Sequence, residues 1–194
     1  AAGGDWQPVG APVATVLGRC GMAWGRGLHS VPAGAVQKRE GDGRAPVGVF
    51  ELGEAFGYAP KDELPPLRLD YRQAVDSLKC VDDSASSHYN AILDQATVTP
   101  DWQSVEDMRR QDALYRYGLF VRHNAPNPLP GGGSCIFIHV WRGEGQGTAG
   151  CTAMAEARVL PLLTWLDPAK QPLLVQFPVQ MLDEARARWN LPRF

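Results

Sequence analysis

Segment 134–152 constrains the fold more than any other part of the chain, because a strand pattern leads there directly into a glycine-rich loop. Side chains alternate along its first half. One face carries Ile136, Ile138 and Val140, and the other carries Cys135, Phe137, His139 and Trp141. Glycines at 143, 145, 147 and 150 free the backbone that follows, and this loop ends at Cys151. We predict a strand that displays His139 and a loop that returns Cys151 toward it.

A thiol beside an imidazole is the minimal apparatus for nucleophilic acyl chemistry. The base raises the thiolate fraction and later protonates the leaving group. We therefore take Cys151 as the candidate nucleophile and His139 as the candidate base. A glycine at position 150 is best explained by the close approach of another backbone segment. The N–H groups of Gly150 and Cys151 would together form an oxyanion hole. A helix that began soon after Cys151 would further favour the thiolate.

Two blocks of this chain resemble the YkuD-type L,D-transpeptidases, over roughly residues 13–178. The first is I-H-V-W followed by G-T-A-G-C-T-A-M, which resembles the family's histidine, variable loop and Ser/Thr-His-Gly-Cys signature. The second, D-G-R-A-P-V-G-V-F at 42–50, resembles its upstream Thr-Pro-x-Gly-x-Phe block. Three features depart from the pattern. Ala149 replaces the second histidine, Ala153 replaces a frequent arginine, and only eleven residues separate His139 from Cys151.

The resemblance implies a function, a fold and a location. Cys151 would form a thioester with a peptidoglycan stem peptide and pass the acyl group to an amine, which gives a cross-link or an exchanged D-amino acid. The resemblance further implies a β-sandwich fold and no cofactor, and we expect the protein to be periplasmic or secreted. Hydrolysis by an L,D-carboxypeptidase or an amidase is the alternative on the same scaffold. An inactive wall-binding module with an unreactive Cys151 is the alternative from another class.

Four further residues are candidates for substrate binding, each with a structural alternative. Thr148 stands at the family's Ser/Thr position and orients the loop, or only stabilises a turn. Trp141 shares a face with His139 and would wall the groove. Arg142 would pair with a substrate carboxylate, unless it is an ordinary exposed arginine. His123 would substitute for the missing second histidine, or simply lies exposed beside a loop.

Composition excludes several classes of partner. The 19 basic and 21 acidic residues give a net charge of −2, which predicts no nucleic-acid surface. No apolar run reaches the 18 residues that a membrane span needs. The start of the chain lacks both a signal-peptide pattern and an initiator methionine, which fits a processed, exported protein. The loop glycines lack the βαβ context of a dinucleotide site. The sequence does not indicate an oligomeric state.

Cysteine spacing bears on metals and disulfides. The cysteines at 20, 80, 135 and 151 contain no C-x-x-C pair, and the four histidines contain no H-x3-H pair, so no structural zinc site is predicted. With Cys151 as a free nucleophile, at most one intramolecular disulfide can form. A bridge from Cys80 to Cys135 is one possibility. The other is that the three remaining cysteines, at 20, 80 and 135, are unpaired and simply fill the core as small buried hydrophobic residues.

The remaining pattern predicts a mainly β fold with a few helical insertions and a C-terminal helix. Residues 1–12 read as a tail, and 13–194 as a single catalytic domain. Short strands are predicted at 13–17 and 20–24, as a hairpin, and at 47–52, 67–71, 77–81, 117–123 and 173–177. Helices are predicted at 86–93, 102–114, 154–166 and 179–189. Segments 117–123 and 134–141 should form a hairpin.

Overall fold

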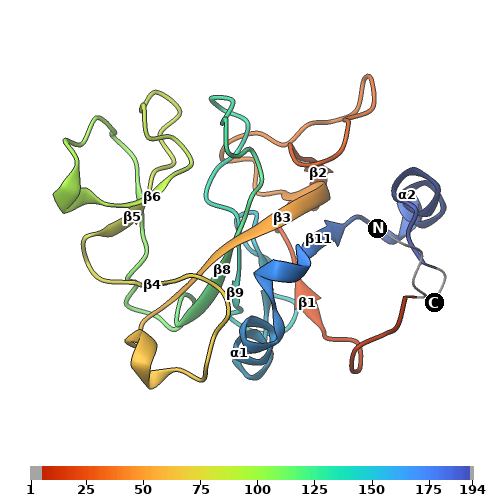
Figure 1. Ribbon diagram of the computed structural model, residues 1–194. Coiled ribbons are helices and arrows are strands. Elements are labelled where there is room, and N and C mark those ends of the chain that lie inside the picture. The colour runs from red at the N-terminus through yellow and green to blue at the C-terminus, as the bar shows by residue number, and fades with distance from the viewer. Residues whose placement is uncertain (1–5, 193–194) are drawn as a thin grey trace.

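An eight-stranded sheet organises the chain in the computed structural model, which describes residues 6–192 (Figure 1). Its main path runs β1-β10-β9-β8-β3-β11, and β2 and β4 also pair with β3. The strands are β1 (Thr15–Val16), β2 (Met22–Trp24), β3 (Ala45–Gly57), β4 (Tyr71–Gln73), β8 (Tyr117–Val121), β9 (Phe137–Val140), β10 (Thr152–Met154) and β11 (Leu173–Gln176). The predicted mainly β class is confirmed.

Strand β3 is the longest element, and it contains the apolar block that was predicted as a strand. Its first half pairs with β2 and β11, and its second half pairs with β8 and β4. Gly48 is required there, because a Cβ atom at this position would lie 1.9 Å from Cε1 of His29. The predicted hairpin of β1 and β2 is wrong: β1 pairs with β10, and β2 runs parallel to β3.

The sheet places the two candidate catalytic residues on neighbouring strands. β8 and β9 form the predicted antiparallel hairpin, and β10 then lies parallel to β9 on its other side. Thr152 is opposite Ile138, and Ala153 is opposite His139. Cys151, one residue before Thr152, therefore lies level with Phe137 and shares a sheet face with His139.

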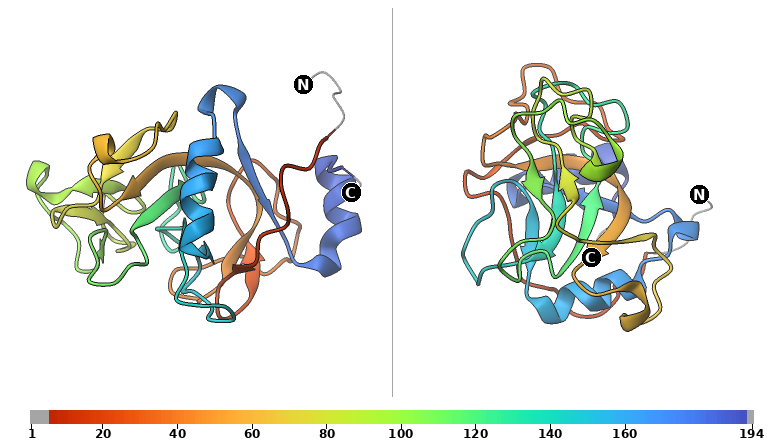
Figure 2. Two further views of the ribbon diagram at one scale, coloured as in Figure 1. Left: turned by 90° about the horizontal axis from the view of Figure 1, so that it is seen from below. Right: turned by 90° about the vertical axis from the view of Figure 1, so that its left-hand side faces the viewer.

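Both faces of β9 are covered, as the alternating pattern requires. Ile136, Ile138 and Val140 pack with Val159 and Leu163 of α1 (Glu156–Trp165) in one hydrophobic cluster. The opposite face forms a second cluster that includes Phe56, Tyr115, Phe137 and Cys151. In Figure 2, α1 lies along the main sheet. Helix α2 (Leu182–Trp189) lies at the opposite end of the molecule from a second, smaller sheet. The predicted terminal helix is confirmed, preceded by η4 (Val179–Met181).

A second, three-stranded sheet replaces the two helices predicted at 86–93 and 102–114. It consists of β6 (Ile92–Asp94), β5 (Leu78–Cys80) and β7 (Glu106–Asp107), in that order, and the remaining short elements are η1 (Lys61–Glu63), η2 (Gln95–Thr97) and η3 (Pro168–Lys170). Side chains hold its loops in non-helical turns: the Asp83 carboxylate accepts the Ala85 and Gln103 amides, and Asp101 accepts both Ser86 and Ser87. These bonds compete with a helical ladder.

A disulfide joins the small sheet to the strand that carries the histidine. Cys80 of β5 bonds to Cys135, two residues before β9. Cys20 is free and exposed, and Cys151 is free and buried, so the alternative of three buried hydrophobic thiols is wrong. Asn90 supports the same junction: its amide nitrogen donates to the carbonyls of His123 and Asn124, and its oxygen accepts the Cys135 amide at 2.9 Å.

We expect Cys135→Ser to destabilise the protein without blocking its covalent chemistry. The disulfide closes a loop of 55 residues, which corresponds to about 4 kcal/mol of unfolding free energy. Urea denaturation measures this loss, and Cys80→Ser is the matched control that should lose the same amount. The side chain of Cys135 makes no bond to the candidate nucleophile, which contacts only its carbonyl. A folded Cys135→Ser protein that no longer reacts with substrate would contradict this separation of roles.

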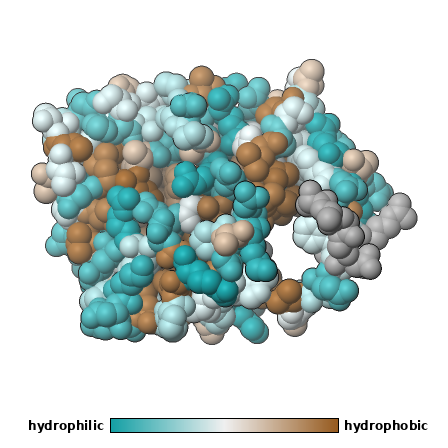
Figure 3. Space-filling model, viewed as in Figure 1, coloured by the Kyte–Doolittle hydropathy of each residue, from teal (hydrophilic) through white to brown (hydrophobic). Residues whose placement is uncertain are grey.

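The surface view in Figure 3 mixes hydrophilic and hydrophobic residues over the face shown. Between residues 6 and 192, no helix combines the length and the apolar character that crossing a bilayer would require. Within the same range, no group of three or more His, Cys, Asp or Glu side chains is arranged to hold a metal ion.

Candidate active site

A cavity of about 420 Å³ opens at the junction of the two sheets, and it contains most of the predicted site. Its walls come from β9, from the loop that leads to β10, and from the small sheet with the segment after it. The predicted residues that line it are His139, Trp141, Arg142, Thr148, Gly150 and Cys151. Ala149 lines it as well, at the position where a second histidine is expected.

Cys151 lines this cavity with 8 % of its surface exposed. Its Sγ accepts the Phe137 amide hydrogen at 3.3 Å and donates to the Cys135 carbonyl at 3.6 Å. Burial raises the pKa of this thiol to about 12, and the nearby charge of Glu106 acts in the same direction. The helix predicted at 154–166 is α1, but it begins at Glu156 after the intervening strand β10, so its N-terminus is not next to Cys151. The resting group is a neutral thiol.

His139 occupies an inner strand, and its ring orientation fixes its tautomer. Nδ1 lies 2.7 Å from the Val140 carbonyl oxygen, which only accepts, so Nδ1 carries the hydrogen. Nε2 is then the unprotonated nitrogen and can accept a proton. Burial lowers the pKa of His139 to about 4, so the imidazole is neutral at physiological pH. The expectation that His139 stands on the face opposite Ile136, Ile138 and Val140 is confirmed.

The cavity therefore holds a neutral thiol and a neutral imidazole. With pKa values of about 12 and about 4, a thiolate–imidazolium pair is not populated in the free protein. A histidine of this kind takes the proton while sulfur attacks, as a general base. The arrangement provides a buried nucleophile and a base with a defined tautomer inside one cavity.

The loop between them is held by Thr148. Its hydroxyl donates to the Cys151 carbonyl at 2.6 Å and accepts the Gly150 amide at 3.1 Å. The predicted orienting role is consistent with these bonds. They also correct the expected oxyanion hole, because the Gly150 N–H is already bonded to the threonine. The close approach predicted at Gly150 is confirmed: a Cβ atom there would lie 3.0 Å from the Arg44 carbonyl oxygen.

Comparison with known proteins decides the family. The family model of the YkuD L,D-transpeptidase catalytic domain matches residues 11–180. This chain belongs to that family. No curated protein and no solved structure matches it. The family acts on peptidoglycan, and residues 139–151 form the part of this L,D-transpeptidase domain that carries the candidate nucleophile and base.

His123 does not belong to the cavity of this L,D-transpeptidase domain. It is 1 % exposed; its Nε2 lies 2.9 Å from the Gly132 carbonyl oxygen, and its Nδ1 accepts the Arg26 amide. Burial lowers its pKa to about 4. The prediction that His123 replaces the missing second histidine is therefore wrong, as is its expected exposure. Both nitrogens serve the backbone of neighbouring loops.

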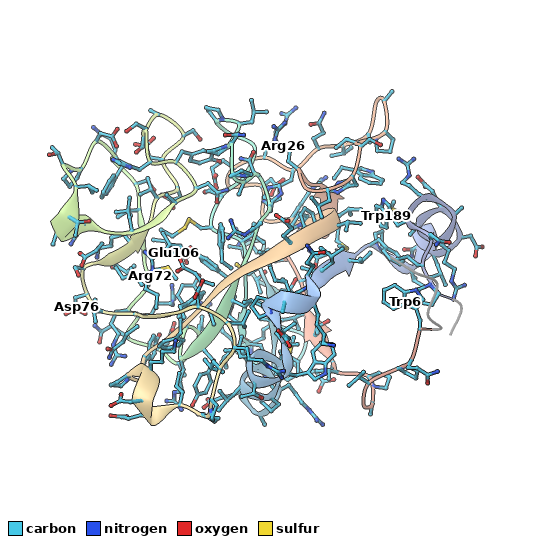
Figure 4. The ribbon with its side chains drawn as sticks, viewed as in Figure 1. Trp6, Arg26, Arg72, Asp76, Glu106 and Trp189 are labelled. Atoms are coloured by element: carbon cyan, nitrogen blue, oxygen red, sulfur yellow. A yellow bond between two sulfur atoms is a disulfide. The ribbon has the colours of Figure 1, made fainter. Side chains whose placement is uncertain are left out.

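Sequence reasoning missed the far wall of the cavity in this transpeptidase domain. That wall carries Tyr115, the acidic residues Glu40, Asp82 and Glu106, and the basic residues Lys38 and Arg110. Figure 4 marks Glu106 at the small sheet. Lys38 forms an ion pair at 2.8 Å with Asp42, the first residue of the block at 42–50 that resembles the family's upstream motif. Tyr115 lies two residues before the strand predicted at 117–123, and this position is the only sequence signal that could have pointed to it.

Proposed function

We propose that this chain is a cysteine acyltransferase that acts on the stem peptides of peptidoglycan, at a bond joining an L-configured centre to a D-amino acid. Membership of the L,D-transpeptidase family supports the substrate. One observation carries the chemistry: Cys151 and His139 share a sheet face and a cavity, and the bond from Nδ1 to the Val140 carbonyl leaves Nε2 free to act as a base.

The reaction proceeds in two balanced steps. As Sγ of Cys151 attacks the donor carbonyl, Nε2 of His139 takes the thiol proton. The C–N bond then breaks, the imidazolium gives that proton to the leaving amine, and a thioester remains. An acceptor amine or water attacks the thioester and passes its proton to Nε2, and the thiol returns. The amide of Cys151 is the proposed oxyanion donor, where one such donor contributes about 3 kcal/mol to transition-state stability.

The cavity carries charges of both signs, which suits a substrate with both carboxylates and ammonium groups. Arg142 and Arg19 lie at its loop side. Arg142 is exposed and free to turn toward a substrate carboxylate, which is the role we propose for it. Trp141 on the same wall supplies an apolar surface beside the base. No cofactor enters this chemistry.

We infer that the protein works outside the cytoplasm, in the periplasm or as a secreted protein. Its family acts on the cell wall. The Cys80–Cys135 disulfide supports the same location, because such bonds persist in oxidising compartments.

The fate of the thioester depends on the acceptor side of the cavity. Transfer to an amine requires that water be kept away. Ala149 is small and exposed at the cavity wall, and the loop of eleven residues supplies little material to close it. Ala153 does not contribute, because it is fully buried beside His139. We therefore expect substantial hydrolysis alongside any cross-linking.

The test is incubation with muropeptides, with and without excess D-amino acid, followed by mass spectrometry of the products. Shortened stems should accumulate beside exchanged or cross-linked stems. Nearly exclusive exchange or cross-linking would contradict the hydrolysis claim and favour an ordinary transpeptidase. No product from any donor would contradict the proposed substrate and favour the wall-binding alternative. Slow thiol alkylation alone does not separate these cases, because burial keeps the Cys151 pKa at about 12 in the free protein.

A further inference from the structure

Tyr115 packs directly against the candidate base, and neither the family motif nor the mechanism above assigns it a role. Its ring meets the His139 imidazole edge to face, with centroids 5.2 Å apart and an interplanar angle of 73°. It also contacts Phe137 on the same strand, at 5.5 Å. Tyr115 is 3 % exposed and lines the cavity beside Cys151.

The ring of Tyr115 is held from its far end by the small sheet. Its hydroxyl donates to Oε1 of Glu106, a residue of β7. Arg110 lies 3.9 Å from the same carboxylate oxygen and 5.2 Å from the centre of the tyrosine ring. Asp112 holds Arg110 in turn, through two hydrogen bonds of 2.9 and 3.0 Å. Tyr115 is therefore fixed at its hydroxyl and covered on its face.

The imidazole of His139 bonds to backbone carbonyls, that of Val140 on its own strand and that of Leu114 on the segment before β8. Hydrogen bonds at the ring edge alone leave the imidazole freedom to tilt. A neighbouring aromatic ring with a fixed position removes that freedom, since edge-to-face pairs have a preferred geometry. A base that tilts away from the thiol loses much of its catalytic effect.

We propose that Tyr115, anchored through its hydroxyl to Glu106, is a positioning residue that holds the His139 imidazole with Nε2 toward Cys151. This inference rests on the proposed function, in which His139 is the base. It gives the small sheet a part in catalysis, because β7 supplies Glu106 and is itself held by its pairing with β5. The segment from β5 to Tyr115 then forms the support of the base.

Charged groups lie near both reacting residues, so a variant that tests the Tyr115 anchor must leave these charges unchanged. Arg110 and Asp112 act on His139, and Glu106, Lys38 and Arg110 act on Cys151. Replacing Glu106 changes the charge near the thiol as well as the anchor. Tyr115→Phe removes only the hydroxyl, so it tests the anchor without changing charge. Tyr71→Phe is the matched control, since the Tyr71 hydroxyl also donates to an acceptor, the Ala59 carbonyl at 2.6 Å, but Tyr71 lies outside the cavity.

The experiment measures steady-state kinetics on muropeptides and, separately, the titration of His139 by NMR, with its resonance assigned by comparison with His139→Ala. For Tyr115→Phe we expect about a tenfold loss of kcat with little change in KM. The pKa of His139 should rise from about 4 toward its ordinary value, because a loosened wall admits water and relieves the burial that lowers it. Tyr71→Phe should change neither quantity.

An unchanged kcat and an unchanged His139 titration in folded Tyr115→Phe would overturn the proposal and leave Tyr115 as a packing residue. If Tyr115→Phe does not fold, Glu106→Ala removes the same bond from the other partner and should raise the His139 pKa likewise; no rise there also overturns it. The NMR titration needs no substrate. A wild-type protein that turns over no muropeptide would therefore refute the proposed function while the titration still tests the positioning of His139.

Discussion

Replacing Cys151 by alanine should abolish formation of every product, both hydrolysed and transferred, because the acyl group is carried on this sulfur alone. The residue is buried and its neighbours contact it through backbone groups, namely the Phe137 amide and the Cys135 carbonyl. Loss of the sulfur should therefore leave the fold intact. Muropeptide digestion followed by mass spectrometry measures the loss, and circular dichroism checks the fold.

Cys20→Ala is the matched control for this experiment, since Cys20 is the other free cysteine and is exposed. It should retain full activity. Residual turnover by a folded Cys151→Ala protein would contradict the assignment of the nucleophile and point to water activated directly by His139.

Replacing His139 by alanine should reduce turnover by about 10²- to 10⁴-fold, the usual contribution of a positioned general base. Its pKa of about 4 sets the sign of the pH dependence. The imidazole must be neutral to accept the thiol proton, so wild-type activity should rise as pH increases through about 4 and then level off. His139→Ala should lose this rise together with most of the rate. Rates measured between pH 3.5 and 8, on protein shown to be folded, check both effects.

His88→Ala provides the comparison for this second variant, because His88 does not line the cavity and its ring packs against Trp102, at 5.8 Å between rings. It should keep both the rate and the pH profile. If folded His139→Ala retains wild-type turnover, the histidine is a core residue rather than the base.

The sequence predicts the fold best where alternation is strict. The face carrying Ile136, Ile138 and Val140 enters one core cluster, and His139 lies on the other face, as its spacing requires. The parallel return of β10 beside β9 is the step that brings Cys151 level with Phe137. The glycine loop indicates such a return but does not fix its direction, because the direction depends on bonds between distant residues such as Arg19 to Thr148.

The far wall of the site could not be predicted because its segment was predicted as a helix. Charges at i and i+4, such as Glu106 and Arg110, are typical of an exposed helix. The two side chains do meet, at 3.9 Å, but on a strand and a turn whose shape depends on the disulfide and on the bonds of Asp83. Glu106 instead serves Tyr115. The burial of His123 could not be predicted either, because the ring is enclosed by two loops, around Arg26 and Gly132, that are distant from each other in the sequence.

Intact-protein mass spectrometry after brief exposure to a stem-peptide donor should detect the proposed thioester on Cys151. We expect a mass increase equal to the donor minus its leaving D-amino acid, located on Cys151 by peptide mapping. The adduct should disappear with hydroxylamine, which cleaves thioesters, and should be absent from Cys151→Ala. A donor that is turned over without any adduct on Cys151, under conditions that trap the intermediate, would rule out Cys151 as the nucleophile.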